Sequence, residues 1–210
     1  MGVLKRQSTS ISNYEKAAQI IMAGGIVAYP TETSYGLAVD PFSERALKRL
    51  FSVKKRSQNK AFSVLAGNKE HLLLLAQDIP PQYSPLMEMF WPGPLTLIFK
   101  ANKKLPAILT AEDETVGVRI SSHPVAMKLV EAVSRPITAT SANISGQAAA
   151  ESSDEVYEQF GDAIDMILID DSGLQGQWST VVKLDGDQLK LVRPGIIPFH
   201  EIQRVAGMKP

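Results

Sequence analysis

The chain has 210 residues, and its 22 Lys and Arg residues balance 22 Asp and Glu residues, so the formal net charge at pH 7 is zero. This balance argues against a protein that binds mainly to a nucleic-acid backbone, which usually requires a basic face. The absence of cysteine excludes disulfides, thiolate metal sites and a cysteine nucleophile. The longest plainly apolar run, Leu72–Ala76, is too short to span a bilayer, and the basic N-terminus lacks the apolar stretch of a secretory signal. We therefore expect a globular protein of the cytoplasm with no membrane contact.

Hydrophobic periodicity predicts helices and strands that mix along the whole chain. The first element is a helix over 13–23, where apolar residues recur at helical spacing before a Gly-Gly pair. Short strands follow at 26–30 and 37–39, and Ser43 can cap a helix that should end near Lys54 or Lys55. Further strands are expected at 61–66, 95–101, 115–120, 165–170 and at the start of 136–143. Further helices are expected after Asn68, at 125–133, at 153–161 and from about 199, with a short amphipathic turn around 86–90. The segment 179–195 is typical of a hairpin turning at Asp185-Gly186.

This order of elements favours one α/β domain built on a mixed sheet. Early alternation of helix and strand suggests crossover connections, whereas the hairpin and the adjacent strands suggest antiparallel pairing. No repeat, low-complexity tract or change of composition marks a linker. We therefore expect a single domain over 1–210 with a core of about 13–200.

The common catalytic motifs are missing from the sequence. It contains no G-x-x-x-x-G-K-[ST] phosphate loop, no G-x-G-x-x-G dinucleotide turn and no G-x-S-x-G elbow. The three histidines, His71, His123 and His200, are scattered without metal-ligand spacing. The acidic cluster 112–114 is more typical of a solvated loop than of a general-acid pair.

Four polar stretches remain, and each lies at the edge of a predicted strand or helix. They are PTETSYG (30–36), VKKRSQNK (53–60), GVRIS (117–121) and TSANISG (140–146). Alone, each has a structural explanation: hydroxyl-rich turns, an edge-strand arginine, or cations that complement a helix dipole. The helix dipole accounts for Lys54 and Lys55 but not for Lys60, which lies beyond the turn. Together the stretches bring hydroxyls, an amide and cations to the ends of sheet elements, where open α/β sheets bind ligands.

These stretches resemble the YrdC-like family of threonylcarbamoyl-AMP synthases. The K-x-R…S-x-N pattern of that family falls on Lys54, Arg56, Ser141 and Asn143. The segments GGIVAYPTETSYGLAVDP, FWPGPLTLIF, VGVRIS, WSTVV and LVRPG also match, so that the resemblance covers roughly 13–200. The sequence departs from the pattern at Ser57, where proline usually follows K-x-R, and at Leu65, where some relatives carry histidine. The chain is similar to the short, single-domain form of the family.

The resemblance implies a fold, an activity and a set of site residues. The fold would be a twisted mixed sheet flanked by helices, with a concave, positively charged cavity. The activity would convert L-threonine, bicarbonate or CO₂, and ATP with Mg²⁺ into threonylcarbamoyl-AMP and pyrophosphate, and partner proteins would then modify the adenosine beside the tRNA anticodon. The implied threonine-binding residues are Thr33, Arg119 and Ser179; the implied nucleotide-binding residues are Arg56, Lys60, Thr115, Ser141, Asn143 and Arg193; the implied catalytic residues are Lys54 and Arg56.

No residue in these stretches is typical of a nucleophile or an obligatory general base. We therefore expect catalysis by positioning and electrostatic stabilisation of several negative groups. Two alternatives stay open at this point. One is an RNA-binding module that uses the basic cavity for weak binding of tRNA or double-stranded RNA; the other is a YciO-like relative with the same cavity and weak or altered activity.

Overall fold

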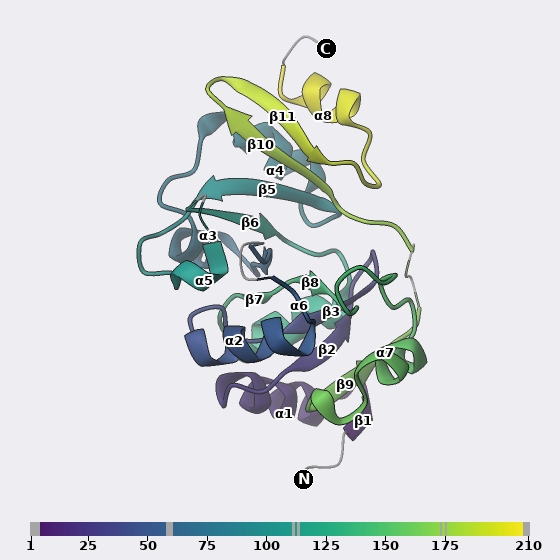
Figure 1. The fold of residues 1–210 in the computed structure, drawn as a ribbon. Helices are drawn as coiled ribbons and strands as arrows, with labels where there is room; N and C mark the ends of the chain where they lie inside the picture. The colour runs from purple at the N-terminus through teal and green to yellow at the C-terminus, as the bar shows by residue number, and fades with distance from the viewer. Residues whose placement is uncertain are drawn as a thin grey trace.

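The strands of the protein form two mixed sheets, one above the other in Figure 1. The computed structural model describes residues 5–57, 61–110, 112, 114–172, 174 and 176–207. The five-stranded sheet has the order β1 (Lys5–Ser8), β9 (Met166–Ile169), β2 (Val27–Pro30), β3 (Tyr35–Ala38) and β8 (Thr140–Ser141). The six-stranded sheet has the order β11 (Gln188–Arg193), β10 (Thr180–Asp185), β5 (Leu95–Lys100), β6 (Thr115–Arg119), β4 (Val64–Leu65) and β7 (Ile137–Thr138).

Helices flank both sheets, and two of them begin at the caps predicted from the sequence. The helices are α1 (Ile11–Met22), α2 (Glu44–Val53), α3 (Lys69–Leu75), α4 (Ser84–Phe90), α5 (Ala107–Thr110), α6 (Pro124–Val133), α7 (Ser153–Phe160) and α8 (Phe199–Val205), with 3₁₀ turns at Pro81–Tyr83 and Gly161–Ala163. The Ser43 hydroxyl accepts from the Ala46 amide at 3.3 Å, and the Asn68 side chain accepts from the His71 amide at 2.8 Å. No helix in the described part of the chain is long and apolar enough to cross a membrane.

One buried core connects the two sheets. It includes Ala28 and Leu37 of the five-stranded sheet together with Val64, Leu97 and Val118 of the six-stranded sheet, all fully buried. A smaller apolar cluster lies between the five-stranded sheet and the helix pair α1 and α6. Because the larger cluster is continuous between the sheets, they form a single α/β domain, as expected.

The chain passes directly from one sheet to the other at Ala139, which separates β7 from β8. The side chain of Thr138 stabilises this passage, because its hydroxyl donates to the Leu37 carbonyl at 2.8 Å and accepts from the Val39 amide at 3.0 Å. The Ala139 amide donates to the Ser63 carbonyl at 2.8 Å. The predicted strand at the start of 136–143 is therefore two short strands, and the single sheet expected from the sequence is divided here.

Most other elements differ from the expectation in length, but α5 and β1 were not predicted. The strand expected over 61–66 pairs only at Val64 and Leu65. These two residues form β4, which pairs with β6 on one side and with β7 on the other. The edge strand β1 was not predicted, since Lys-Arg-Gln-Ser has no apolar alternation; it forms by parallel pairing with β9. The predicted hairpin is confirmed, with Asp185 paired to Gln188 beside the turn.

Candidate functional site

A polar cavity lies where the two sheets meet. It encloses about 760 Å³ of empty space, part of which is open to solvent. Loops and strand ends from both sheets line it, so its shape depends on how the sheets are joined. The main polar and aromatic lining residues are Tyr29, Thr31, Thr33, Ser34, Tyr35, Arg56, Phe62, Ser63, Thr96, Arg119, Ser141, Trp178, Ser179 and Arg193.

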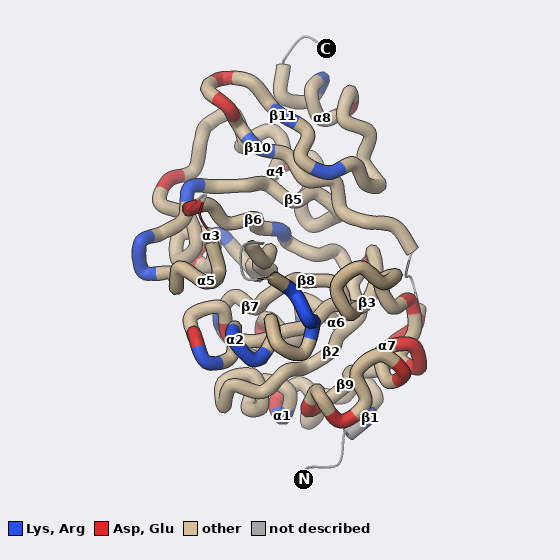
Figure 2. The backbone as a smooth tube through the Cα atoms, viewed as in Figure 1, with Lys and Arg blue, Asp and Glu red and all other residues tan. Residues whose placement is uncertain are grey.

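Three arginines from different elements reach this cavity. Arg119 ends β6, Arg193 ends β11, and Arg56 lies in the basic stretch that follows α2 (Figure 2). Burial lowers the pKa of Arg193, and the positive charges of Arg119 and Arg56 lower it further. Among the described residues, none of those that line the cavity is acidic. Guanidinium groups in this arrangement are well suited to bind carboxylate or phosphate oxygens.

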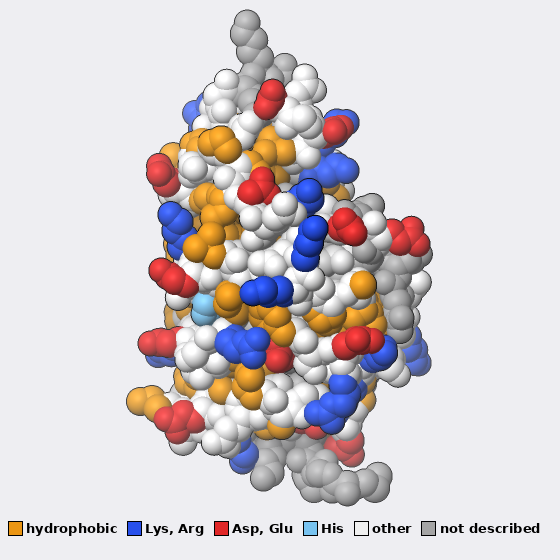
Figure 3. Space-filling model, turned by 90° about the vertical axis from the view of Figure 1, so that its left-hand side faces the viewer, with side chains coloured by type: hydrophobic (Ala, Val, Ile, Leu, Met, Phe, Trp, Pro, Cys, Tyr) orange, Lys and Arg blue, Asp and Glu red, His pale blue; other side chains and the backbone are white. Residues whose placement is uncertain are grey.

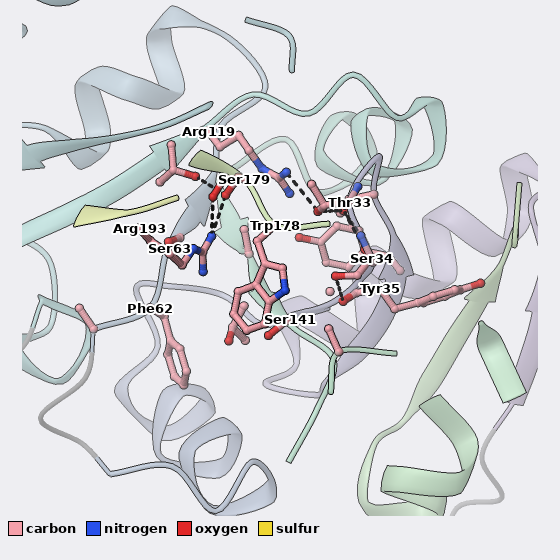
Figure 4. Close-up of a pocket in the computed structure, with 18 of the residues that line it drawn as sticks. Thr33, Ser34, Tyr35, Phe62, Ser63, Arg119, Ser141, Trp178, Ser179 and Arg193 are labelled. Atoms are coloured by element: carbon pink, nitrogen blue, oxygen red, sulfur yellow. Dashed lines mark hydrogen bonds between the residues drawn. The ribbon is translucent and has the colours of Figure 1, made fainter. Parts of the chain in front are cut away.

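Arg119 is held in place by a buried ion pair with Glu32. Its Nη1 atom donates to Glu32 Oε1 at 2.9 Å and to the Thr33 hydroxyl at 3.4 Å (Figure 4 shows the Thr33 contact). The second carboxylate oxygen of Glu32 accepts from the Ser121 hydroxyl. Glu32 and Arg119 are each only 6% exposed. Because water has little access to either group, each charge depends on the other, and the ion pair fixes the direction of the guanidinium.

Hydroxyl groups surround the arginines at two points. The Thr31 and Thr33 hydroxyls lie 2.8 Å apart in the turn after β2, and Thr31 also donates to the Ser34 carbonyl at 2.7 Å. On the opposite wall the Ser179 and Thr96 hydroxyls lie 2.9 Å apart. These hydroxyls are buried, so a ligand would meet donors and acceptors whose positions are already set.

Arg193 is anchored through its Nη2 atom, which donates to both the carbonyl and the hydroxyl of Ser179 at 2.9 Å (Figure 4). Its guanidinium carbon also lies 5.0 Å from the centre of the Trp178 ring. The Nε atom of Arg193 is buried and has no hydrogen-bond partner in the described part of the chain. Such an unpaired donor is unusual in a folded protein and is consistent with a ligand site.

Lys54 lies behind the cavity wall and holds the loop after β8. Its Nζ atom donates to the carbonyls of Ser141 at 2.5 Å and Asn143 at 2.8 Å, and its own carbonyl accepts from the Ser145 amide at 2.8 Å. The side chain is 1% exposed, and burial lowers the pKa of Lys54 to about 7, with a smaller contribution from the charge of Arg56. Lys54 therefore positions the loop that carries Ser141.

The structure brings six of the predicted site residues to the cavity: Thr33, Arg56, Arg119, Ser141, Ser179 and Arg193. Lys54 and Asn143 do not line it; the Asn143 amide instead donates to the Ile144 and Gln147 carbonyls within its own loop. Thr115 lies at the opposite end of β6 from Arg119 and is also outside the lining. Lys60 lies outside the described residues. Ser57 is exposed beyond Arg56, and Leu65 is fully buried in the core.

The residues of this region that the sequence analysis missed include Glu32, Ser63, Thr96 and Trp178. Glu32 lies within the hydroxyl-rich stretch PTETSYG. A single acidic residue among groups expected to bind anions could have indicated an ion pair with one of the cations. Thr96 and Ser63 gave no signal, because each becomes part of the site only through pairing of distant strands. Trp178 is the first residue of the WSTVV motif, so its position beside Ser179 could have been inferred.

Two of the three histidines have structural roles in the described part of the chain. His123 caps α6, since its Nδ1 atom accepts from the Val125 amide at 3.2 Å, and the His71 Nδ1 atom accepts from the Gly67 amide at 3.2 Å. On the face drawn in Figure 3, basic and acidic side chains are interspersed. That face therefore offers no continuous basic surface to a nucleic-acid backbone.

The two mixed sheets form one α/β protein, and the arginines and hydroxyls that converge on its cavity are side chains suited to a small anionic ligand. Residues 19–195 match the model of the Sua5, YciO and YrdC family, which is described as "Telomere recombination". The chain therefore belongs to the Sua5/YciO/YrdC family.

Individual relatives agree with this assignment. The chain is 40% identical over 191 residues to a threonylcarbamoyl-AMP synthase of Pyrococcus abyssi, a match that covers 91% of this chain and 56% of the relative. It is 33% identical to a threonylcarbamoyl-AMP synthase of Vibrio vulnificus, with 85% of this chain and 97% of the relative covered. The chain thus spans little more than half of one relative and nearly all of the other.

Solved structures show the same fold. The crystal structure of P. abyssi Sua5 complexed with L-threonine matches with a TM-score of 0.91 and 37% identity, covering 99% of this chain and 61% of that chain. Escherichia coli YciO matches with a TM-score of 0.82 and 24% identity, covering 93% of this chain and 97% of that chain, and supports the fold alone.

Proposed function

We propose that this protein is a threonylcarbamoyl-AMP synthase, a nucleotidyltransferase that joins L-threonine, bicarbonate or CO₂, and ATP. The convergence of Arg56, Arg119 and Arg193 on one cavity carries the proposal. The names of the relatives and the threonine held by the P. abyssi structure support it. We further propose that the protein acts in the cytoplasm, where partner proteins transfer the threonylcarbamoyl group to the adenosine beside the tRNA anticodon.

The reaction requires several anions to lie together. Two unit charges 4 Å apart repel each other by roughly 4 kcal/mol near a protein surface, and the threonine carboxylate, the carbamate and the triphosphate are all negative. Three guanidinium groups offset this repulsion and can bind oxygens in pairs. We assign the threonine to Thr33 and Arg119, two buried residues that line this cavity.

The nucleotide would occupy the part of the cavity lined by Arg56, Ser141 and Arg193. The threonine amine and bicarbonate form a carbamate with loss of water. A carbamate oxygen then attacks the α-phosphorus of ATP, the bond between the α-phosphorus and the bridging oxygen breaks, and pyrophosphate leaves with that oxygen. Mg²⁺ enters with ATP as part of this substrate and lowers the charge of the departing pyrophosphate. The protein supplies position and charge rather than a covalent intermediate.

Pyrophosphate release tests the proposal directly. Purified protein is incubated with ATP, Mg²⁺, bicarbonate and each amino acid in turn, and we expect release that requires both bicarbonate and threonine. Arg56→Ala should lower the rate at least tenfold, because Arg56 lines the cavity, whereas Arg45→Ala should not, because the Arg45 side chain bonds the Ala23 carbonyl away from it. Release that needs neither co-substrate, or an unchanged rate in Arg56→Ala, would overturn the proposal.

A further inference from the structure

Trp178 is an unusual member of the cavity wall. Its side chain is 48% exposed, and among the described residues it is the one exposed large apolar side chain that lines this cavity. Aromatic rings bring a large stabilisation when they are buried, so a half-exposed indole in a ligand site gives up part of that stabilisation in the free protein. One exposed apolar side chain is ordinary on a protein surface, but this one lines a cavity next to a cation, where a ligand could cover it.

The position of the indole is set by a tightly packed backbone. The Trp178 carbonyl accepts from the Ile196 amide at 2.9 Å, and the Thr180 amide donates to the Pro94 carbonyl at 3.0 Å. Gly195 lies so close that a Cβ atom there would be 2.2 Å from the Trp178 carbonyl oxygen. The backbone that carries the indole is therefore held in place at the cavity wall. Figure 4 shows the indole among the other labelled lining residues.

The groups around Trp178 define the ligand chemistry. Arg193 lies over the ring, with its guanidinium carbon 5.0 Å from the ring centre, and its buried Nε atom has no partner among the described residues. Ser141 lines the same cavity and carries a hydroxyl that donates to Asn143 at 2.6 Å. An aromatic surface beside a cation suits a ligand with a flat ring at one end and an anionic chain at the other. Threonine has no flat ring, whereas a nucleotide has both parts.

We infer that Trp178 is the stacking surface for the base of the nucleotide substrate, and that Arg193 holds the ring from one face while the base stacks on the other. The inference rests on the proposed function, in which this cavity binds ATP, and extends it to the part of ATP that does not react. Stacking on an aromatic side chain tolerates different bases but requires a base. Affinity that depends on Trp178 should therefore be lost when the phosphates are offered alone.

Tryptophan fluorescence provides the first test, because the chain has only two tryptophans. Trp91 lies outside the cavity lining, and its indole N–H donates to the Leu95 carbonyl at 2.7 Å. Trp91→Phe therefore leaves Trp178 as the sole tryptophan emitter and serves as the matched control. We expect ATP to quench emission strongly in the wild type and in Trp91→Phe, and inorganic triphosphate at equal saturation to quench it much less.

Binding affinities provide the second test. Trp178→Ala should weaken ATP binding by on the order of tenfold or more and leave the affinity for inorganic triphosphate within about twofold, whereas Trp178→Phe should retain most of the ATP affinity. Equal losses for ATP and triphosphate would instead show that Trp178 only supports Arg193 and would overturn the inference. An unchanged ATP affinity, or a selective loss of threonine affinity, would also overturn it.

The two proposals fail in different ways. If ATP quenches Trp178 but pyrophosphate is never released in the presence of threonine and bicarbonate, the base site stands and the synthase proposal fails. If release is normal in Trp178→Ala with an unchanged KM for ATP, the synthase proposal stands and the base site fails.

Discussion

Removal of the Glu32 carboxylate should destabilise the protein more than any change to a surface charge. Glu32→Ala leaves the Arg119 guanidinium in a site where the two side chains are only 8% and 7% exposed, without its partner 2.9 Å away. Removal of one member of a buried ion pair typically costs about 3–5 kcal/mol, because the remaining charge stays buried and unpaired. Ser121 loses its acceptor at the same time. For a domain of this size, the loss corresponds to a decrease in Tm of roughly 6–20 °C.

Thermal and urea unfolding, followed by circular dichroism, measure this loss. Glu32→Gln keeps the shape and a hydrogen-bonding group, so it should cost less, about 1–2 kcal/mol. Glu44→Ala is the matched control: it removes the exposed partner of Lys48, where the side chains are 61% and 60% exposed, and should cost less than about 0.5 kcal/mol. A Glu32→Ala variant as stable as Glu44→Ala would refute the view that the ion pair is structurally important.

Three further predictions concern the residues around the cavity. Burial lowers the pKa of Lys54 to about 7 from an unfolded value near 10.4, so the unfolded chain binds more protons than the folded protein between these pH values. From pH 7 to pH 9.5 the unfolding free energy of the wild type should therefore rise by roughly 1–3 kcal/mol relative to that of Lys54→Met. Urea titrations that give the same difference between the two proteins at both pH values would contradict this. Gly195→Ala should cost about 1–3 kcal/mol and weaken ATP binding, because the new Cβ would lie 2.2 Å from the Trp178 oxygen; a variant with wild-type Tm and affinity would exclude this close packing. Arg119→Lys should raise the KM for threonine at least tenfold with a change below threefold for ATP, because the single terminal nitrogen of lysine cannot both keep the contacts that Arg119 Nη1 makes to Glu32 and Thr33 and present a planar fork to the ligand. Steady-state pyrophosphate release would show the reverse pattern if Arg119 served the nucleotide.

The run of cations at 54–56 shows how far sequence reasoning could reach. Composition and the predicted helix end located a cluster of charge, and the motif resemblance selected Lys54 and Arg56 from it. The structure separates their roles: Arg56 lines the cavity, Lys55 is exposed with a φ of 49°, and Lys54 turns inward to hold the loop of Ser141. The direction of each side chain depends on the left-handed residue at the end of α2, which the spacing of charges could not reveal.

Long-range pairing explains most of what the sequence could not predict. Period and caps located nearly every helix and strand, because those signals are local. Whether Ile137 and Thr140 belong to one strand or to two sheets depends on partners far along the chain, Leu65 and Leu37. Thr96 reaches Ser179 only because β5 and β10 pair in parallel, and no local pattern carries that information.

Each arginine of the cavity is anchored by the protein through one of its terminal nitrogens. Arg119 bonds Glu32, Arg193 bonds Ser179, and the Nη2 atom of Arg56 donates to the Ala61 carbonyl at 2.9 Å. A guanidinium has five N–H donors, so such an anchor fixes its plane and still lets other donors of Arg119 and Arg193 serve a ligand. Because an ordered side chain loses little entropy when it binds, the anchors should contribute to affinity although they touch no ligand. The groups that decide how well this cavity holds several anions therefore include Glu32, which repels anions by its own charge but fixes the cation that attracts them.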